Sequence, residues 1–152
     1  GYELYCQLLE NAVRELKHQP PKLSIDVEVN LPVEAYISSD YVPEIRHKID
    51  LYRRLSRVDD VQNIQAMQQE LIDRFGKIPL ETMRLFEIAQ LRIDATIWSV
   101  RYIGIEEDHL VFTYGDQRRI EQLARKHRGK LKLYGGQKAY WPLQDEKRPL
   151  LE

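Results

Sequence analysis

The sequence has few of the residues that build covalent or metal-based scaffolds. Cys6 is the only cysteine among 152 residues, so the chain can form neither an internal disulfide nor a cysteine-based metal site. No metal-ligand spacing links its four histidines, which are His18, His47, His109 and His127. No apolar run approaches the roughly 18 residues of a membrane helix, and no signal peptide opens the chain. We therefore predict a cytoplasmic protein with no membrane partner.

Motifs for nucleotide binding and catalysis are also missing. The seven glycines form neither a G-x-x-x-x-G-K-[ST] loop nor a G-x-G-x-x-G fingerprint. Asp59 and Asp60 are adjacent carboxylates, but consecutive side chains diverge, so capping of the next helix is the better interpretation. No histidine lies near Cys6 to activate its thiol. The sequence therefore predicts no enzyme activity, no cofactor and no metal for this chain.

The residues that are present describe an ordinary globular domain. Hydrophobic residues make up 43% and charged residues 31% of the chain, and its net charge is −1. A chain of this length can bury roughly 70% of its unfolded surface. One domain with a short appended element accounts for the length.

Apolar periodicity predicts an amphipathic helix over residues 2–18. Its apolar arc consists of Leu4, Tyr5, Leu8, Leu9, Ala12 and Leu16. Pro20 and Pro21 end this helix because neither can donate a backbone hydrogen bond. We predict a helical arm over 1–20, a compact domain over 21–148 and a tail of cloning origin over 149–152. Because the sequence opens on glycine, we expect a piece of a longer polypeptide.

Three helices are predicted at the start of the compact domain. The first covers residues 43–58, with Arg46, Arg53 and Arg57 outside and with Ile45, Ile49, Tyr52 and Leu55 facing inward. The second ends at Phe75, where Gly76 is expected in a left-handed conformation. The third covers 79–97, with Pro79 in its first turn. Since it is apolar on most sides, we expect it to be central.

Strand signals dominate the rest of the domain. Residues 24–30 alternate as a half-buried edge strand, and strands over 98–105 and 110–114 form a hairpin. A helix over 116–128 is followed by strands over 131–134 and 137–141, joined at Gly135-Gly136 by a two-residue turn. The predicted fold class is α+β, with several helices packed on a small, mostly antiparallel sheet and preceded by the helical arm.

Two charged surfaces are candidates for binding. Residues 118–132 are strongly basic, and the helix face opposite Ile120 and Leu123 carries Arg118, Arg119, Arg125 and Lys126. Such a strip can hold phosphates, but no aromatic residue interleaves with it in the sequence. A solvated face or docking on another protein domain fits equally well.

Glu70 is the second candidate. It points away from the apolar stripe of its helix, and its local partner is Arg74, four residues later. Because such pairs are weak, the carboxylate is expected to be available to an arginine on a partner.

Four passages together resemble the C-terminal domain of the bacterial transcription-repair coupling factors. They are GYELY with LLENAV in residues 1–13, VNLP in 29–32, YVP with YRRL in 41–55, and ELIDRFG with the following proline in 70–79. The resemblance runs from residue 2 to about residue 142 and is looser after Ile105. Residues 1–18 resemble the end of the preceding translocase module.

The resemblance implies a regulatory role. The full protein would be an ATP-driven DNA translocase that displaces stalled RNA polymerase and recruits nucleotide excision repair, with ATP and Mg bound in a module absent here. Its C-terminal domain would dock on the N-terminal UvrB-like module and hide the surface that recruits UvrA. The acidic head of the ELIDRFG passage falls on Glu70, and we extend the candidate contact to Asp73 and Arg74. The alternative is a DNA-contacting module that uses the basic face of residues 118–132.

Overall fold

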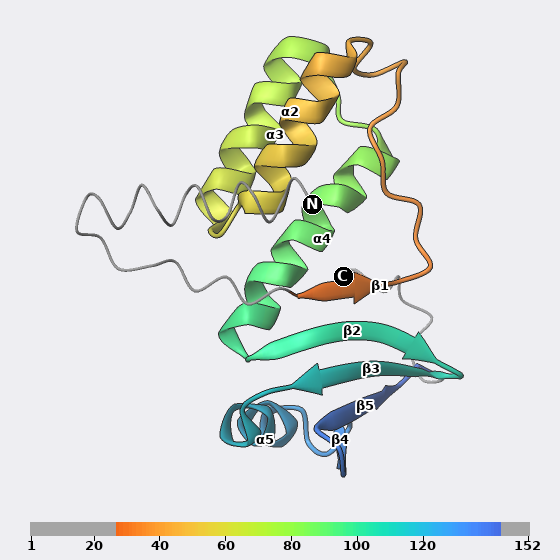
Figure 1. Ribbon diagram of the computed structural model, residues 1–152, viewed down its shortest axis with the longest axis vertical. Coiled ribbons are helices and arrows are strands. Elements are labelled where there is room, and N and C mark those ends of the chain that lie inside the picture. Colours follow the sequence, from red (N-terminus) through yellow and green to blue (C-terminus); the bar gives the residue numbers. More distant parts are fainter. Residues whose placement is uncertain (1–26, 144–152) are drawn as a thin grey trace, which may run out of the picture.

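The computed structural model describes residues 27–143 and confirms the predicted α+β class. Within this part of the chain, four helices and a five-stranded mixed sheet form the fold (Figure 1). The predicted arm over 1–20, the tail over 149–152 and the first residues of the 24–30 strand lie outside the described residues. No described helix is long and apolar enough to cross a membrane.

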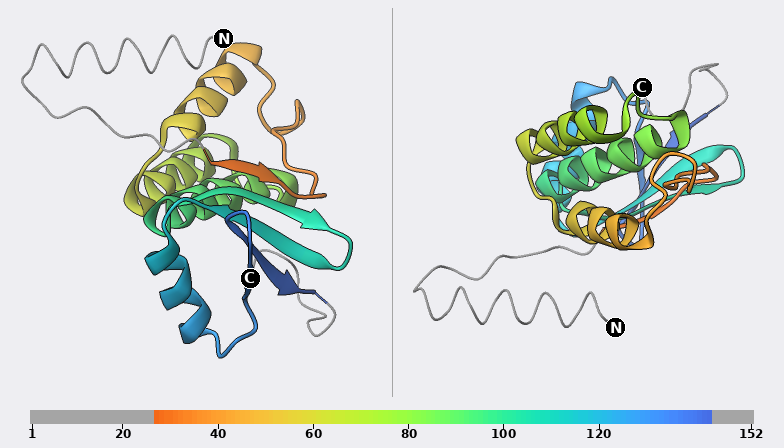
Figure 2. Two further views of the ribbon diagram at one scale, coloured as in Figure 1. Left: turned by 60° about the horizontal axis from the view of Figure 1, so that its bottom comes forward. Right: turned by 90° about the horizontal axis from the view of Figure 1, so that it is seen from above.

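Three helices form one half of the described structure. They are α2 (Ile45–Arg57), α3 (Val61–Phe75) and α4 (Leu80–Ile97). Both α2 and α3 pack against α4 (Figure 2). The hydrophobic cluster between them includes Leu51, Leu55, Ile64, Met67, Leu71 and Phe86. Because α4 also contributes Ala95 to a second cluster, its predicted central position is confirmed.

Local chemistry sets the ends of these helices, with one prediction confirmed and two corrected in detail. Asp60 caps α3, since its side chain accepts a hydrogen bond of 2.8 Å from the backbone N–H of Asn63. Gly76 ends α3 with a φ of 84° and a ψ of −161°. The positive φ was predicted, but the ψ places this residue in the extended region that only glycine adopts readily, not in the left-handed helical region. Pro79 is the residue before α4 and not part of its first turn.

The sheet has the strand order β1-β2-β3-β5-β4. Its strands are β1 (Glu28–Asn30), β2 (Val100–Glu106), β3 (His109–Tyr114), β4 (Lys132–Tyr134) and β5 (Lys138–Pro142). β1 lies at the edge, as predicted, and pairs parallel to β2 with Val29 opposite Ile103. All other pairings are antiparallel.

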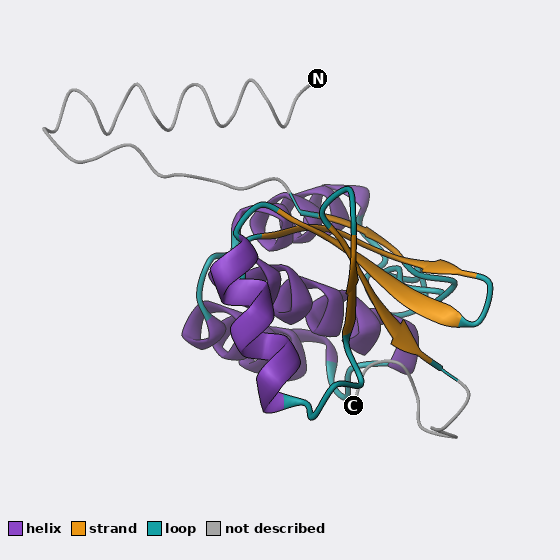
Figure 3. Ribbon diagram, turned by 90° about the horizontal axis from the view of Figure 1, so that it is seen from below, coloured by secondary structure: helices purple, strands orange, loops and turns teal. Residues whose placement is uncertain are grey.

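A second cluster joins one face of the sheet to α4 and to α5 (Gln117–Lys126). Cross-strand neighbours on this face include Ile103, Phe112 and Ala139, and α5 adds Ile120, which is fully buried. Figure 3 shows the helices mostly to one side of the strands. The two clusters therefore meet through α4.

Two further details of the sequence interpretation are wrong. On α2, Ile45, Ile49 and Tyr52 were expected to face inward, but they are 70%, 52% and 40% exposed. The buried residues of α2 are Leu51 and Leu55, because this helix carries two apolar stripes and the core covers the other one. The β4–β5 connection is the second error. Tyr134 pairs with Lys138, which leaves three turn residues, with positive φ at Gly136 and at Gln137.

Candidate interaction site

The 70–76 segment is held in place by Tyr41, which lies in the loop before α2. The Tyr41 hydroxyl donates to the carbonyl oxygen of Gly76 at 2.9 Å and lies 3.3 Å from that of Leu71. Its ring meets Phe75 edge to face, with centroids 5.8 Å apart. Burial raises the pKa of Tyr41, so the hydroxyl stays protonated and remains a donor. The last turn of α3 therefore has a fixed position on the domain.

Glu70 forms a bidentate ion pair with Arg54 across the gap between α3 and α2. The two Arg54 guanidinium nitrogens donate to Oε1 and Oε2 of Glu70 at 3.0 and 2.6 Å. The predicted contact with Arg74 is confirmed, since Arg74 donates to Oε1 at 3.1 Å. Asp50 Oδ2 also lies 3.6 Å from Nη1 of Arg54, the nitrogen that donates to Oε1 of Glu70. The Glu70 side chain is 33% exposed, so it lies at the surface but is already engaged.

This pair shifts the pKa of both partners. The hydrogen bond from Arg54 lowers the pKa of Glu70, against the opposing effect of burial, and the charge of Arg74 lowers it further. The same hydrogen bond raises the pKa of Arg54. Three of about four acceptor positions on the carboxylate are used, which leaves one position on Oε2. The interpretation of Glu70 as a freely available carboxylate is corrected by these contacts.

The other two candidates lie beside Glu70 on α3. Asp73 is exposed and accepts a hydrogen bond of 2.9 Å from Gln69. Arg74 is exposed as well, and its guanidinium lies 4.9 Å from the centre of the Phe75 ring. Arg54 is the site residue that sequence reasoning missed. It belongs to the YRRL passage, but its pairing with Glu70 depends on how α2 and α3 lie on α4.

The structure divides the four basic candidates on α5. Arg119 donates to the carbonyl oxygen of Ile97 at 2.8 Å, and its Nε lies 3.5 Å from Asp116, so it ties α5 to the end of α4. Arg125 lies 4.0 Å from Glu121. Arg118 and Lys126 are exposed on α5. Of the four, Arg118 and Lys126 are therefore better placed than the other two to bind an external anion.

The fold also brings an aromatic residue to the basic segment. Trp141 of β5 lies 5.3 Å from His127, centroid to centroid, and 5.9 Å from the Lys130 ammonium. The sequence showed no aromatic residue within 118–132, because Trp141 reaches this segment only through sheet pairing. No group of three or more His, Cys, Asp or Glu side chains that could hold a metal occurs in the described part of the chain.

These features define an α+β domain with an ion-pair cluster between two of its described helices. A family model described as the TRCF domain matches residues 31–124. The transcription-repair-coupling factor of Myxococcus xanthus is 33% identical over 138 residues, and that of Bacillus subtilis is 31% identical over 122 residues. The chain therefore belongs to the TRCF domain family of the transcription-repair coupling factors.

The matches cover most of this chain and a small part of the relatives. They include 88% and 80% of this chain but only 12% and 10% of the Myxococcus and Bacillus proteins. A crystal structure of a C-terminal domain of transcription-repair coupling factor has a TM-score of 0.66 and 21% identity. It covers 83% of this chain and 86% of its own, and it shows the same fold.

Proposed function

We propose that the chain is the regulatory, autoinhibitory interaction domain of a cytoplasmic transcription-repair coupling factor. It docks on the N-terminal UvrB-like module of the same polypeptide and covers the surface that recruits UvrA. DNA translocation, displacement of RNA polymerase and binding of ATP and Mg belong to other modules. The observation that carries the proposal is the carboxylate of Glu70, held at the surface of α3 at the head of the ELIDRFG passage.

The contacts of Glu70 favour docking by preorganisation. Arg54 fixes the carboxylate in one orientation, so little side-chain entropy is lost when a partner binds. Arg74 is 40% exposed and makes one hydrogen bond to Glu70, so an arginine from the partner can share or replace this contact. Asp73 adds a second exposed carboxylate on the same helix. A closed state favoured by a few kcal/mol would keep the recruitment surface mostly covered.

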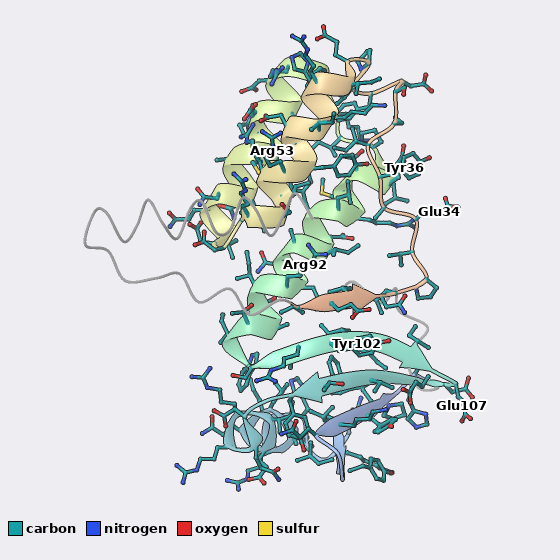
Figure 4. The ribbon with its side chains drawn as sticks, in the orientation of Figure 1. Glu34, Tyr36, Arg53, Arg92, Tyr102 and Glu107 are labelled. Atoms are coloured by element: carbon teal, nitrogen blue, oxygen red, sulfur yellow. The ribbon has the colours of Figure 1, made fainter. Side chains whose placement is uncertain are left out.

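Calorimetric titration of this chain against the isolated N-terminal module tests the proposal. Asp73→Arg is the cleanest variant, because Asp73 takes no part in the Arg54 pair. Asp73→Arg and Glu70→Gln should each weaken binding by about tenfold or more. Glu107→Gln is the matched control, since Glu107 lies at the tip of the β2–β3 hairpin, away from α2 and α3 (Figure 4). Wild-type affinity for both α3 variants would refute docking through this surface.

The alternative function is contact with duplex DNA through the basic segment. It is supported by the exposed Arg118 and Lys126 and by the aromatic ring of Trp141 next to Lys130. A mobility-shift titration should show binding that weakens steeply between about 50 and about 200 mM salt. The Arg118→Glu, Lys126→Glu double variant should reduce this binding, whereas Arg119 is left unchanged because it joins α5 to α4. Absence of binding at low salt would eliminate this function.

A further inference from the structure

The outer side of α2 carries an apolar stripe that no described element covers. It consists of Ile45, Ile49 and Tyr52, spaced four and three residues apart, and is here named the α2 stripe. All three side chains are at least 40% exposed, and none of them belongs to either hydrophobic cluster. Helices of globular proteins normally bury such a stripe, so this one indicates a contact surface.

The α2 stripe is separate from the surface proposed to dock through Glu70. Arg54, the partner of Glu70, lies half a turn around α2 from Ile45 at about 100° per residue. Tyr52 instead joins the stripe to the extended segment before α2, because its hydroxyl accepts a hydrogen bond of 2.8 Å from the backbone N–H of Ile37. A molecule bound on the stripe would therefore contact α2 without covering the Glu70 carboxylate.

Basic side chains border the α2 stripe on both sides. Arg46 and Arg57 are exposed and lie about 60–80° around the helix beyond Ile49. Lys48 is half-buried and lies about 40° beyond Tyr52 on the opposite side. An apolar contact surface with two cationic borders selects a partner by its charge as well as by its shape.

The carboxylates nearest in sequence are directed to other partners. Glu44 lies 3.7 Å from His47, and Asp50 lies 3.6 Å from Arg54. The two borders of the stripe therefore keep their positive charge. A second copy of the chain packed on α2 would place one cationic border against another in either orientation of the two helices, which is unfavourable.

We propose that the α2 stripe binds an acidic amphipathic helix of a partner protein. The stripe is a single row of side chains over about two helical turns, or about 10 Å. This shape fits the groove between side-chain rows of another helix. Carboxylates on both sides of the partner's apolar residues would face the cationic borders. An anionic membrane fits less well, because interfacial helices bury a broad apolar face, whereas the leucines of α2 are already in the core.

A synthetic peptide tests this proposal with the full chain. The probe is a stapled helix of about 20 residues, because shorter isolated helices are marginal in water. It carries leucines spaced four and three residues apart, glutamates on both sides of them and alanine elsewhere. The control peptide has lysine in place of every glutamate. Fluorescence anisotropy should show saturable binding of the glutamate probe and at least about tenfold weaker binding of the lysine peptide.

Variants assign the binding to the stripe and to its borders. Ile49→Glu should weaken binding of the glutamate probe by at least about tenfold. Ile97→Glu is the matched control, since Ile97 is 60% exposed at the end of α4, and it should leave the affinity unchanged. The Arg46→Glu, Arg57→Glu double variant should bind the lysine peptide more tightly than the glutamate probe, because the border has changed sign. Circular dichroism should match the wild type for each variant.

Several results would overturn the proposal. Absence of saturable binding, equal affinity for the two peptides, or an exchanged preference in the Arg118→Glu, Lys126→Glu double variant on α5 would each do so. A dimer in sedimentation equilibrium that Ile49→Glu dissociates would show that a second copy covers the stripe. Binding to phosphatidylglycerol vesicles that Ile49→Glu abolishes would assign the stripe to a membrane. None of these measurements uses the N-terminal module, so their outcome is independent of docking through Glu70.

Discussion

Glu70 and Arg54 meet through two parallel hydrogen bonds, and the stabilisation that this pair gives to the fold depends on pH. The folded state lowers the pKa of Glu70, whereas in the unfolded chain this pKa is about 4.3. The stabilisation is therefore complete above the unfolded pKa and is lost as the pH falls through the lower, folded value. The rise in the pKa of Arg54 has no effect in this range, because arginine stays charged.

Glu70→Gln should lower the free energy of unfolding by about 1 kcal/mol at about pH 7, which is the upper end for surface ion pairs. At about pH 3, below the unfolded pKa, part of this stabilisation is lost, so the difference between the two proteins should shrink. Urea unfolding followed by circular dichroism at both pH values measures this. A difference that is equal at the two pH values would mean that the pair contributes little and that the amide disturbs packing instead.

Tyr41 allows the contribution of a hydrogen bond from a neutral group to be tested. Tyr41→Phe keeps the edge-to-face contact with Phe75 but removes the donor to the Gly76 carbonyl oxygen. The free energy of unfolding should fall by about 1–2 kcal/mol, since a carbonyl group near the end of α3 loses its partner. Hydrogen exchange of the last-turn amides of α3 should accelerate at the same time. Unchanged stability would indicate that water replaces the hydroxyl.

The ends of α3 were predictable from sequence, and the orientation of α2 was not. Asp60 and Gly76 act on the backbone within a few residues of themselves, so their roles can be identified from local sequence. On α2, Leu51 and Leu55 compete for the core with a second apolar stripe that begins at Ile45, and only packing against α4 decides between the two stripes. The Arg54–Glu70 pair was missed for the same reason, because its partners are 16 residues apart on different helices.

Gly76 allows the backbone conformation that ends α3, the helix with the candidate site, to be tested. Gly76→Ala should destabilise the domain by about 1–3 kcal/mol, because alanine is strained at a φ of 84° and a ψ of −161°. No atom lies within 4 Å of the added Cβ, so the cost comes from the backbone and not from a clash. Gly135→Ala is the matched control, since its Cβ also meets open space and its φ is not positive. Equal thermal midpoints for the two variants would contradict this explanation.

The whole described molecule is organised around α4. Phe86 and Ala89 of α4 lie in the helical cluster, and Ala95 lies in the cluster that joins the sheet to α5. The apolar character of 79–97 predicted this central position. Parallel pairing of β1 with β2 was not predicted, because it joins residues 28–30 to residues 102–104 and depends on the path of the three helices between them.

Phe86→Ala tests whether the two halves unfold together. Phe86 is 1% exposed, so its truncation should cost about 3–5 kcal/mol. The only tryptophans, Trp98 and Trp141, pack against the other cluster, so their fluorescence reports on the sheet half. If α4 couples the halves, fluorescence and circular dichroism should shift to the same lower urea midpoint. A fluorescence midpoint that stays at the wild-type value would show two independent units.

The directions of β1 and β5 have a mechanical consequence. β1 is parallel to β2, and β5 runs in the same direction because both β2 and β5 are antiparallel to β3. The start of β1 and the end of β5 therefore lie at opposite ends of the sheet. Tension applied between Glu28 and Pro142 acts along the strands. It loads the hydrogen bonds between neighbouring strands together, in shear, instead of breaking them one by one. The sheet can bear such a load while the helices of the other half stay off the line of force.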